Sequence, residues 1–123
     1  MFFEKSIKIS TMKIYHNPRC KKSRAGLALL EEKSNDFEIV NYLKDGISKE
    51  EISEIIKKTG LPAEELIRKQ EDIYKKALKG KKLTTEEWIN AIVENPKLLK
   101  RPIIINNNKA VWADPPENLN TIL

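Results

Sequence analysis

The chain has 123 residues, of which 40% are hydrophobic, so it is long enough for one domain with a single core and hardly long enough for two. Its net charge is +5, from 23 Lys and Arg against 18 Asp and Glu, and the charges are interspersed rather than gathered in blocks. Interspersed charge, without zinc-finger spacing or a basic segment studded with aromatics, argues against a nucleic-acid-binding protein.

A single cysteine, Cys20, sets limits on the chemistry of the chain. One thiol cannot form an internal disulfide or supply the paired cysteines of a zinc site, so we expect no bound metal and a cytoplasmic location. Residues 1–11 lack the apolar run of a signal peptide, and no later stretch has the length and apolarity of a membrane span. We therefore expect no membrane association.

An apolar alternation that is typical of a strand begins at Met12, so we expect one domain over residues 12–123. Residues 1–11 are interpreted as an extension, either disordered or left from cloning. A weak apolar alternation at residues 7–9 leaves an added edge strand as an alternative.

The first predicted elements form a β-α-β unit. Apolar alternation predicts a strand at residues 13–16, and a face of leucines and alanines predicts a helix over residues 21–32. Residues 37–43 alternate as a second strand, which the intervening helix would place parallel to the first.

Helical patterns fill the middle of the chain, about residues 48–100. Two capping boxes, Ser48 with Glu51 and Thr84 with Glu87, each precede an apolar helical face. Another helix is predicted to begin within residues 61–65 and to carry Arg68.

The end of the chain returns to strands. Residues 103–105 and 110–113 form a predicted hairpin around an Asn-rich turn, and residues 115–117 begin a last helix. The order β-α-β, helical block, β-β-α predicts an α/β fold, a thioredoxin-like mixed sheet with an inserted helical block.

The loop between the first strand and the first helix carries the candidate site. It holds the only histidine and the only cysteine, His16 and Cys20, among four cations. A turn at Asn17 leads to Cys20 at the start of the helix, where unpaired backbone N–H groups favour a thiolate and a bound anion. Ser23 stands where a Cys-x-x-Cys pair would have its second thiol, so an external thiol must restore Cys20.

Three separated motifs carry a family likeness. Residues 15–24 read YHNPRCKKSR, residues 66–70 read LIRKQ, and residues 100–104 read KRPII. In this order they resemble the glutaredoxin-linked arsenate reductases of the ArsC family, which also contains Spx-like regulators. The resemblance covers nearly all of residues 12–123, and it implies a thioredoxin-like fold and thiol chemistry.

The resemblance also implies catalytic roles in the loop. Cys20 would attack arsenate, and His16 would tune the thiol. Ser23 and Arg24 would assist Cys20.

Two distant arginines, Arg68 and Arg101, would hold the oxyanion, and Asn17 and Pro102 would shape the backbone of the site, with Pro102 in the cis form. The family's third arginine is missing, because the corresponding position is Asp114. Losing one charge-assisted contact would weaken anion binding by about 1.5 to 3 kcal/mol. Compensation by Arg19 or Lys22 is one possible outcome.

We expect a monomer. The resemblance implies that it reduces arsenate or a related oxyanion, with glutathione as reducing co-substrate, glutaredoxin as partner and no bound cofactor. Two alternatives stay open. The missing third arginine favours a related thiol reductase with another oxyanion or a disulfide as substrate. An Spx-like protein that binds RNA polymerase is the other, although such regulators have a Cys-x-x-Cys pattern that Ser23 contradicts.

Overall fold

A mixed four-stranded sheet forms the centre of the computed structural model, which describes residues 12–123. The strand order is β2-β1-β3-β4. β1 (Met12–Tyr15) pairs in parallel with β2 (Glu38–Val40) and antiparallel with β3 (Ile103–Asn106). β3 and β4 (Lys109–Trp112) form the predicted hairpin, so both the parallel pair and the hairpin are confirmed. The edge strand considered at residues 7–9 lies outside the described residues.

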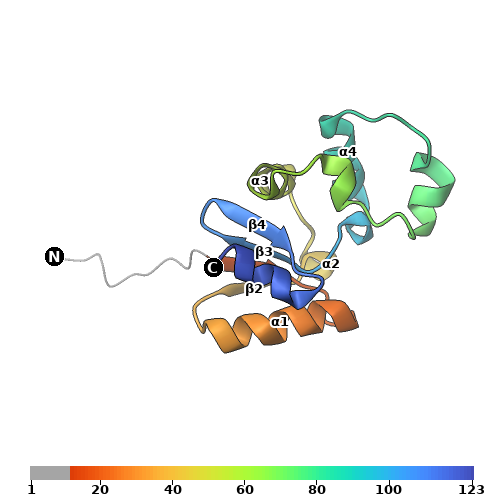
Figure 1. Ribbon diagram of the computed structural model, residues 1–123. Helices are drawn as coiled ribbons and strands as arrows, with labels where there is room; N and C mark the ends of the chain where they lie inside the picture. The colour runs from red at the N-terminus through yellow and green to blue at the C-terminus, as the bar shows by residue number, and fades with distance from the viewer. Residues whose placement is uncertain (1–11) are drawn as a thin grey trace.

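Helices cover both faces of the sheet (Figure 1). α1 (Lys21–Lys33) and the 3-10 helix Pro116–Thr121 pack together on one face. On the other face, α3 (Lys49–Thr59) packs against β3 and β4, and α4 (Thr85–Glu94) packs against α3. None of the described helices combines the length and apolarity that a membrane span requires.

The segment between β2 and β3 is built mainly from helices, as predicted. Besides α3 and α4 it contains four short helical pieces: α2 (Tyr42–Asp45), the 3-10 helices Ala63–Leu66 and Pro96–Leu98, and the π-helical turn Tyr74–Leu78. The two predicted capping boxes are confirmed, since the Ser48 and Thr84 side chains accept from the N–H groups of Glu51 and Glu87.

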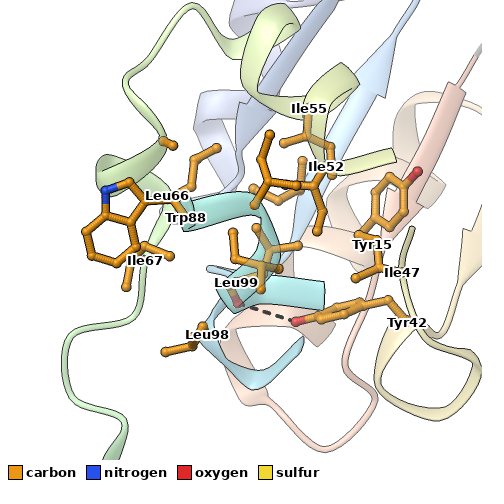
Figure 2. Packing of buried hydrophobic residues seen from close by; sticks show 14 of the residues in the cluster. Tyr15, Tyr42, Ile47, Ile52, Ile55, Leu66, Ile67, Trp88, Leu98 and Leu99 are labelled. Atoms are coloured by element: carbon orange, nitrogen blue, oxygen red, sulfur yellow. Dashed lines mark hydrogen bonds between the residues drawn. The ribbon is translucent and has the colours of Figure 1, made fainter. Parts of the chain in front are cut away.

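Strand alternation divides the core into two clusters. Ile14 and Ile104 face α1 and contribute to a cluster with Leu30 and Leu119. The larger cluster lies on the opposite face, where the neighbouring strand residues, including Tyr15, meet the inserted helices (Figure 2). The inserted segment therefore shares a core with the sheet.

The predicted strand over residues 37–43 is too long. β2 ends at Val40, and Tyr42 begins the short helix α2. Tyr42 is fully buried in the larger cluster, and its hydroxyl donates to the backbone oxygen of Leu99 at 3.4 Å (Figure 2). This tertiary contact turns the chain away from the sheet.

The helix predicted to carry Arg68 is also wrong, because the 3-10 helix ends at Leu66. Ile67 instead forms an isolated antiparallel bridge with Leu99. Two backbone bonds flank the bridge, from Arg68 N to Leu98 O at 2.7 Å and from Lys100 N to Leu66 O at 2.9 Å. Arg68 thereby lies beside the segment that leads to Arg101.

Candidate functional site

The loop after β1 is a tight turn that ends at Cys20. The backbone oxygen of Asn17 accepts from the Cys20 N–H at 3.0 Å, and the Asn17 side chain accepts from the Arg19 N–H at 3.0 Å. Cys20 is the N-cap residue of α1. The predicted position of the thiol, at the positive end of a helix, is confirmed.

Three contacts favour the thiolate form of Cys20. Burial of the half-buried thiol raises its pKa, but a hydrogen bond from the Arg101 side chain and the backbone N–H groups of Ser23 and Lys22 outweigh that effect, and the positive charge of Arg101 adds to them. The net result is a Cys20 pKa below its ordinary value. A larger fraction of the side chain is therefore the nucleophilic thiolate at neutral pH.

His16 is held by Ser23 beneath the loop. Both side chains are buried, and His16 Nδ1 lies 2.7 Å from Ser23 Oγ. Ser23 Oγ also accepts from the Asn17 N–H at 3.0 Å. Burial lowers the pKa of His16, and the charge of Arg24 acts in the same direction against a weaker opposite effect of Glu31. His16 is therefore neutral at pH 7, and its contact with Ser23 joins the residue after β1 to the first turn of α1.

Arg24 lies on the outside of the loop. Its Nη1 donates to the backbone oxygen of Pro18 at 3.0 Å. This hydrogen bond ties the first turn of α1 to the turn before Cys20. Arg24 thus supports the loop from an exposed position.

Asp114, which the resemblance sets at the position of the missing third arginine, forms an ion pair. Its Oδ2 lies 3.2 Å from Lys22 Nζ. Lys22 was one of the two cations expected to compensate for the loss. Its ammonium group is directed to Asp114 instead.

The Arg101–Pro102 peptide bond is cis, as the resemblance implies, and Asp114–Pro115 is a second cis bond that was not predicted. The Trp112 indole N–H donates to the Arg101 oxygen at 3.1 Å, and the Ala113 N–H donates to the Pro102 oxygen at 2.9 Å. These bonds to β4 and the chain after it fix the backbone beneath the guanidinium of Arg101.

Arg101 keeps one unused donor. Its Nε is buried and has no hydrogen-bond partner among the described residues. A buried N–H of a charged group is costly to leave unsatisfied, and an oxyanion is a suitable acceptor. The donor therefore supports an anion site beside Cys20.

Arg68 is half-buried and forms an ion pair through Nη1 with Oε2 of Glu71. Its charge and that of Arg101 both lower the pKa of Tyr42, so both arginines lie near this tyrosine. Only one of the terminal nitrogens of Arg68 is used by Glu71. The rest of its planar fork remains available to an anion.

Tyr42 is a site residue that the sequence analysis missed. Burial raises its pKa to about 12, although Arg101 and Arg68 act in the opposite direction, and the charge of Cys20 raises the pKa further. The Tyr42 hydroxyl therefore stays protonated, and it donates to the Leu99 oxygen. Tyr42 follows the second strand of the β-α-β unit, and ligands commonly bind at the ends of such strands. This position was the signal available in the sequence.

The structure thus brings Cys20, Arg101, Tyr42 and Arg68 together. His16 instead contacts Ser23, and Ser23 and Arg24 bond to the backbone of the loop. The arrangement can hold an oxyanion next to a thiolate. Across residues 12–123, His, Cys, Asp and Glu side chains form no group of three suited to a metal ion.

Comparisons with known proteins agree with this geometry. The ArsC family matches residues 15–122. An arsenate reductase from Neisseria meningitidis serogroup B is 41% identical over 91% of this chain and 97% of its own length. The uncharacterised protein YfgD of Escherichia coli K12 is 43% identical over 91% of this chain and 96% of its own length.

A solved structure shows the same fold. The arsenate reductase from Vibrio cholerae superposes with a TM-score of 0.87 at 36% identity, covering 94% of this chain and all of that one. The α/β fold with a thioredoxin-like sheet and an inserted helical segment is therefore confirmed.

Proposed function

Because the chain belongs to the ArsC family, we propose that it is a thiol-dependent arsenate reductase in which Cys20 is the nucleophile. The observation that carries the proposal is the Cys20 thiol at the start of α1, hydrogen-bonded to Arg101 and with a lowered pKa. Relatives that are named arsenate reductases, at about 41% identity, support the choice of substrate.

In the first step, the Cys20 thiolate attacks arsenic and displaces one hydroxyl group of arsenate. That hydroxyl leaves as water after taking a proton from solvent. Arg101 and Arg68 offset the negative charge of the oxyanion, and the N–H groups at the start of α1 orient it.

Two external thiols then complete a two-electron reduction. The first forms a disulfide with Cys20 as the sulfur–arsenic bond breaks, and the electron pair of that bond stays on arsenic, which leaves as arsenite. The second attacks the mixed disulfide and releases the Cys20 thiolate. The net reaction converts arsenate and two thiols into arsenite, one disulfide and water. Glutathione is proposed as the first thiol and glutaredoxin as the carrier of the second.

The test is arsenate-dependent consumption of NADPH in a mixture of glutathione, glutathione reductase and glutaredoxin. The wild type is expected to turn over steadily, and Cys20→Ser is expected to show only the background rate. Arg68→Ala and Arg101→Ala are expected to raise the KM for arsenate at least tenfold, because each removes a charge-assisted contact. Equal rates for the wild type and Cys20→Ser would overturn the proposal.

The ion pair between Asp114 and Lys22 favours a second candidate, an ArsC-like thiol reductase whose substrate carries less negative charge. A carboxylate near the anion site opposes a multiply charged oxyanion. Asp114→Arg provides the test, since it restores the family's third arginine. If arsenate is the substrate, this variant is expected to lower the KM for arsenate. If the variant has no effect and a small disulfide is reduced faster than arsenate, the second candidate is favoured.

A further inference from the structure

One of the two arginines at the candidate site, Arg68, is paired with a carboxylate. Arg68 Nη1 donates to Oε2 of Glu71, and the two side chains are only 18% and 22% exposed. The neighbouring ion pair of Lys69 with Glu64 has exposed fractions of 51% and 47%. Solvent screens a half-buried pair less than an exposed one, so the contact between Arg68 and Glu71 restrains both side chains more strongly.

A tight turn brings Glu71 back to Arg68. The Glu71 N–H donates to the Arg68 oxygen at 3.2 Å, and the Glu71 oxygen accepts from the Lys75 N–H at 3.1 Å. On the other side of the turn, the Arg68 N–H donates to the Leu98 oxygen at 2.7 Å. The backbone at both partners is therefore fixed by hydrogen bonds that do not depend on their side chains.

A guanidinium group has more donors than one carboxylate oxygen uses. The contact with Glu71 is made at the Nη1 end of Arg68, and it does not use the edge formed by Nε and Nη2. An oxyanion can accept two parallel N–H bonds from such an edge. A long side chain that is ordered before binding also loses less entropy when the anion arrives.

The ion pair belongs to the candidate site and not to a remote surface. Burial raises the pKa of Tyr42 most, the charge of Arg68 lowers it, and the charge of Cys20 raises it further, so both charges lie near this tyrosine. Glu71 lines an open groove together with residues 17–19 of the thiol loop. The carboxylate therefore holds Arg68 beside the loop that carries the nucleophile.

Glu71 can act on a bound anion in two opposite ways. Its negative charge repels the anion, whereas its contact with Nη1 orders the guanidinium that the anion touches. Repulsion weakens with distance, and Arg68 itself offsets the charge of the carboxylate, while ordering acts at the contact with the anion. We propose that Glu71 is a positioning residue that holds Arg68 ready for the oxyanion. The inference rests on the proposed function, because that reaction begins with binding of an oxyanion.

The KM for arsenate tests the role of Glu71. Glu71→Ala is expected to raise this KM about fivefold with little change in kcat, which is the loss expected when one long side chain has to be ordered on binding. Glu71→Gln keeps a side-chain oxygen that can accept from Nη1, so it is expected to retain a KM near that of the wild type. The matched control is Glu64→Ala, which breaks the exposed ion pair with Lys69 and is expected to leave the KM unchanged.

A double variant shows whether Glu71 acts through Arg68. In the Arg68→Ala protein, the further change Glu71→Ala is expected to have no effect on the KM, because the side chain that it positions is gone. A full additional rise would show an independent role and would overturn the inference. A lower KM in both Glu71→Ala and Glu71→Gln would show that the carboxylate competes with the anion, which also overturns it.

Inorganic sulfate tests the same contact without turnover. The readout is the sulfate concentration that halves the rate of Cys20 alkylation by iodoacetamide at pH 7, relative to the rate of each full-length variant without sulfate. This concentration is expected to be about fivefold higher in Glu71→Ala than in the wild type, Glu71→Gln or Glu64→Ala. Absence of protection in the wild type, or equal protection of the wild type and Glu71→Ala, would overturn the inference.

The two proposals fail in different ways. If the wild type does not reduce arsenate but sulfate protection weakens in Glu71→Ala as expected, only the proposed function is wrong. If arsenate is reduced and Glu71→Ala keeps the wild-type KM and the wild-type sulfate protection, only the role of Glu71 is wrong.

Discussion

At the scale of single residues, Arg101 is the side chain that lowers the pKa of the Cys20 thiol. Its side chain donates to the Cys20 sulfur, and this contact is the first of those that lower the thiol pKa against the effect of burial. Arg101→Ala is therefore expected to raise the pKa of Cys20, leaving less thiolate at pH 7. The measurement is the rate of alkylation by iodoacetamide as a function of pH, and its midpoint should move to higher pH.

The neighbouring Lys100 provides the control for this prediction. Its ammonium group lies 4.5 Å from the centre of the Trp112 ring, so Lys100→Ala removes the same charge one residue away without removing the hydrogen bond to sulfur. The alkylation midpoint of this variant should stay near that of the wild type. Equal midpoints for Arg101→Ala and the wild type would contradict the assignment.

The lowered pKa of His16 predicts how the free energy of unfolding depends on pH. Burial and the charge of Arg24 lower its folded-state pKa below the unfolded value of about 6.5, so below pH 6.5 the unfolded chain binds more protons than the folded protein. The free energy of unfolding should fall as the pH decreases from about 6.5 toward the folded pKa. His16→Asn, which keeps an acceptor near the Nδ1 position, should remove this part of the slope.

Urea unfolding at pH 5, 6, 7 and 8 checks the prediction. His16 is the only histidine, so the difference between the wild type and the variant isolates its titration from that of the carboxylates. A difference that stays constant over this pH range would show that His16 does not titrate as described.

At the scale of elements, Gly26 sets the distance between α1 and the end of the sheet. A Cβ built at this position would lie 2.5 Å from Cγ of Pro102 and 3.4 Å from the oxygen of Ala113. Helix propensity favours alanine over glycine by about 1 kcal/mol, but the proline ring cannot rotate away from the added methyl group. Gly26→Ala is therefore expected to destabilise the protein, because overpacking costs about 1 to 3 kcal/mol.

Thermal unfolding measures the sign of this effect. Ala28→Gly on the exposed side of the same helix serves as the reference, and it should cost about 1 kcal/mol through propensity alone. A higher melting temperature for Gly26→Ala would mean that α1 can shift away from Pro102 at little cost.

The elements that local patterns determine were predictable from the sequence. Ser48 and Thr84 begin α3 and α4 as capping boxes predict, because every partner of such a box lies within three residues. The start of α1 at Cys20 follows from a local turn in the same way.

Contacts distant in sequence explain what was missed. The backbone at Ile67 follows its bridge to Leu99, and the turn at Tyr42 follows burial in the core and a bond to the same residue. Periodicity within a short window contains no information on such partners. The ion pair of Lys22 with Asp114 could not be predicted from the sequence for the same reason.

At the scale of the whole molecule, the shared core predicts one cooperative unfolding transition over residues 12–123, as expected of a single domain. Ile52 and Leu66 of the inserted segment pack in the same cluster as Tyr15 and Ile103 of the sheet. An insertion that depends on the sheet for its core should not unfold separately from it.

Two tryptophans allow a direct test, because Trp88 lies in the inserted segment and Trp112 lies on β4. Trp112→Phe leaves tryptophan fluorescence only from the insertion, and Trp88→Phe leaves it only from the sheet. In each variant, the urea midpoint from fluorescence should coincide with the midpoint from circular dichroism. Separate midpoints within one variant would indicate two units.

The bridge between Ile67 and Leu99 has a consequence for how this protein can change over evolution. It sets the spacing of Arg68 and Arg101 through backbone bonds that do not involve the loop carrying Cys20. Substitutions in the loop can therefore alter the reactivity of the sulfur while the spacing of the two guanidinium-bearing residues is preserved. Changes in the loop can thus tune the strength of the nucleophile at a fixed arginine spacing, whereas a change of Arg101 itself affects both the thiol and the anion site.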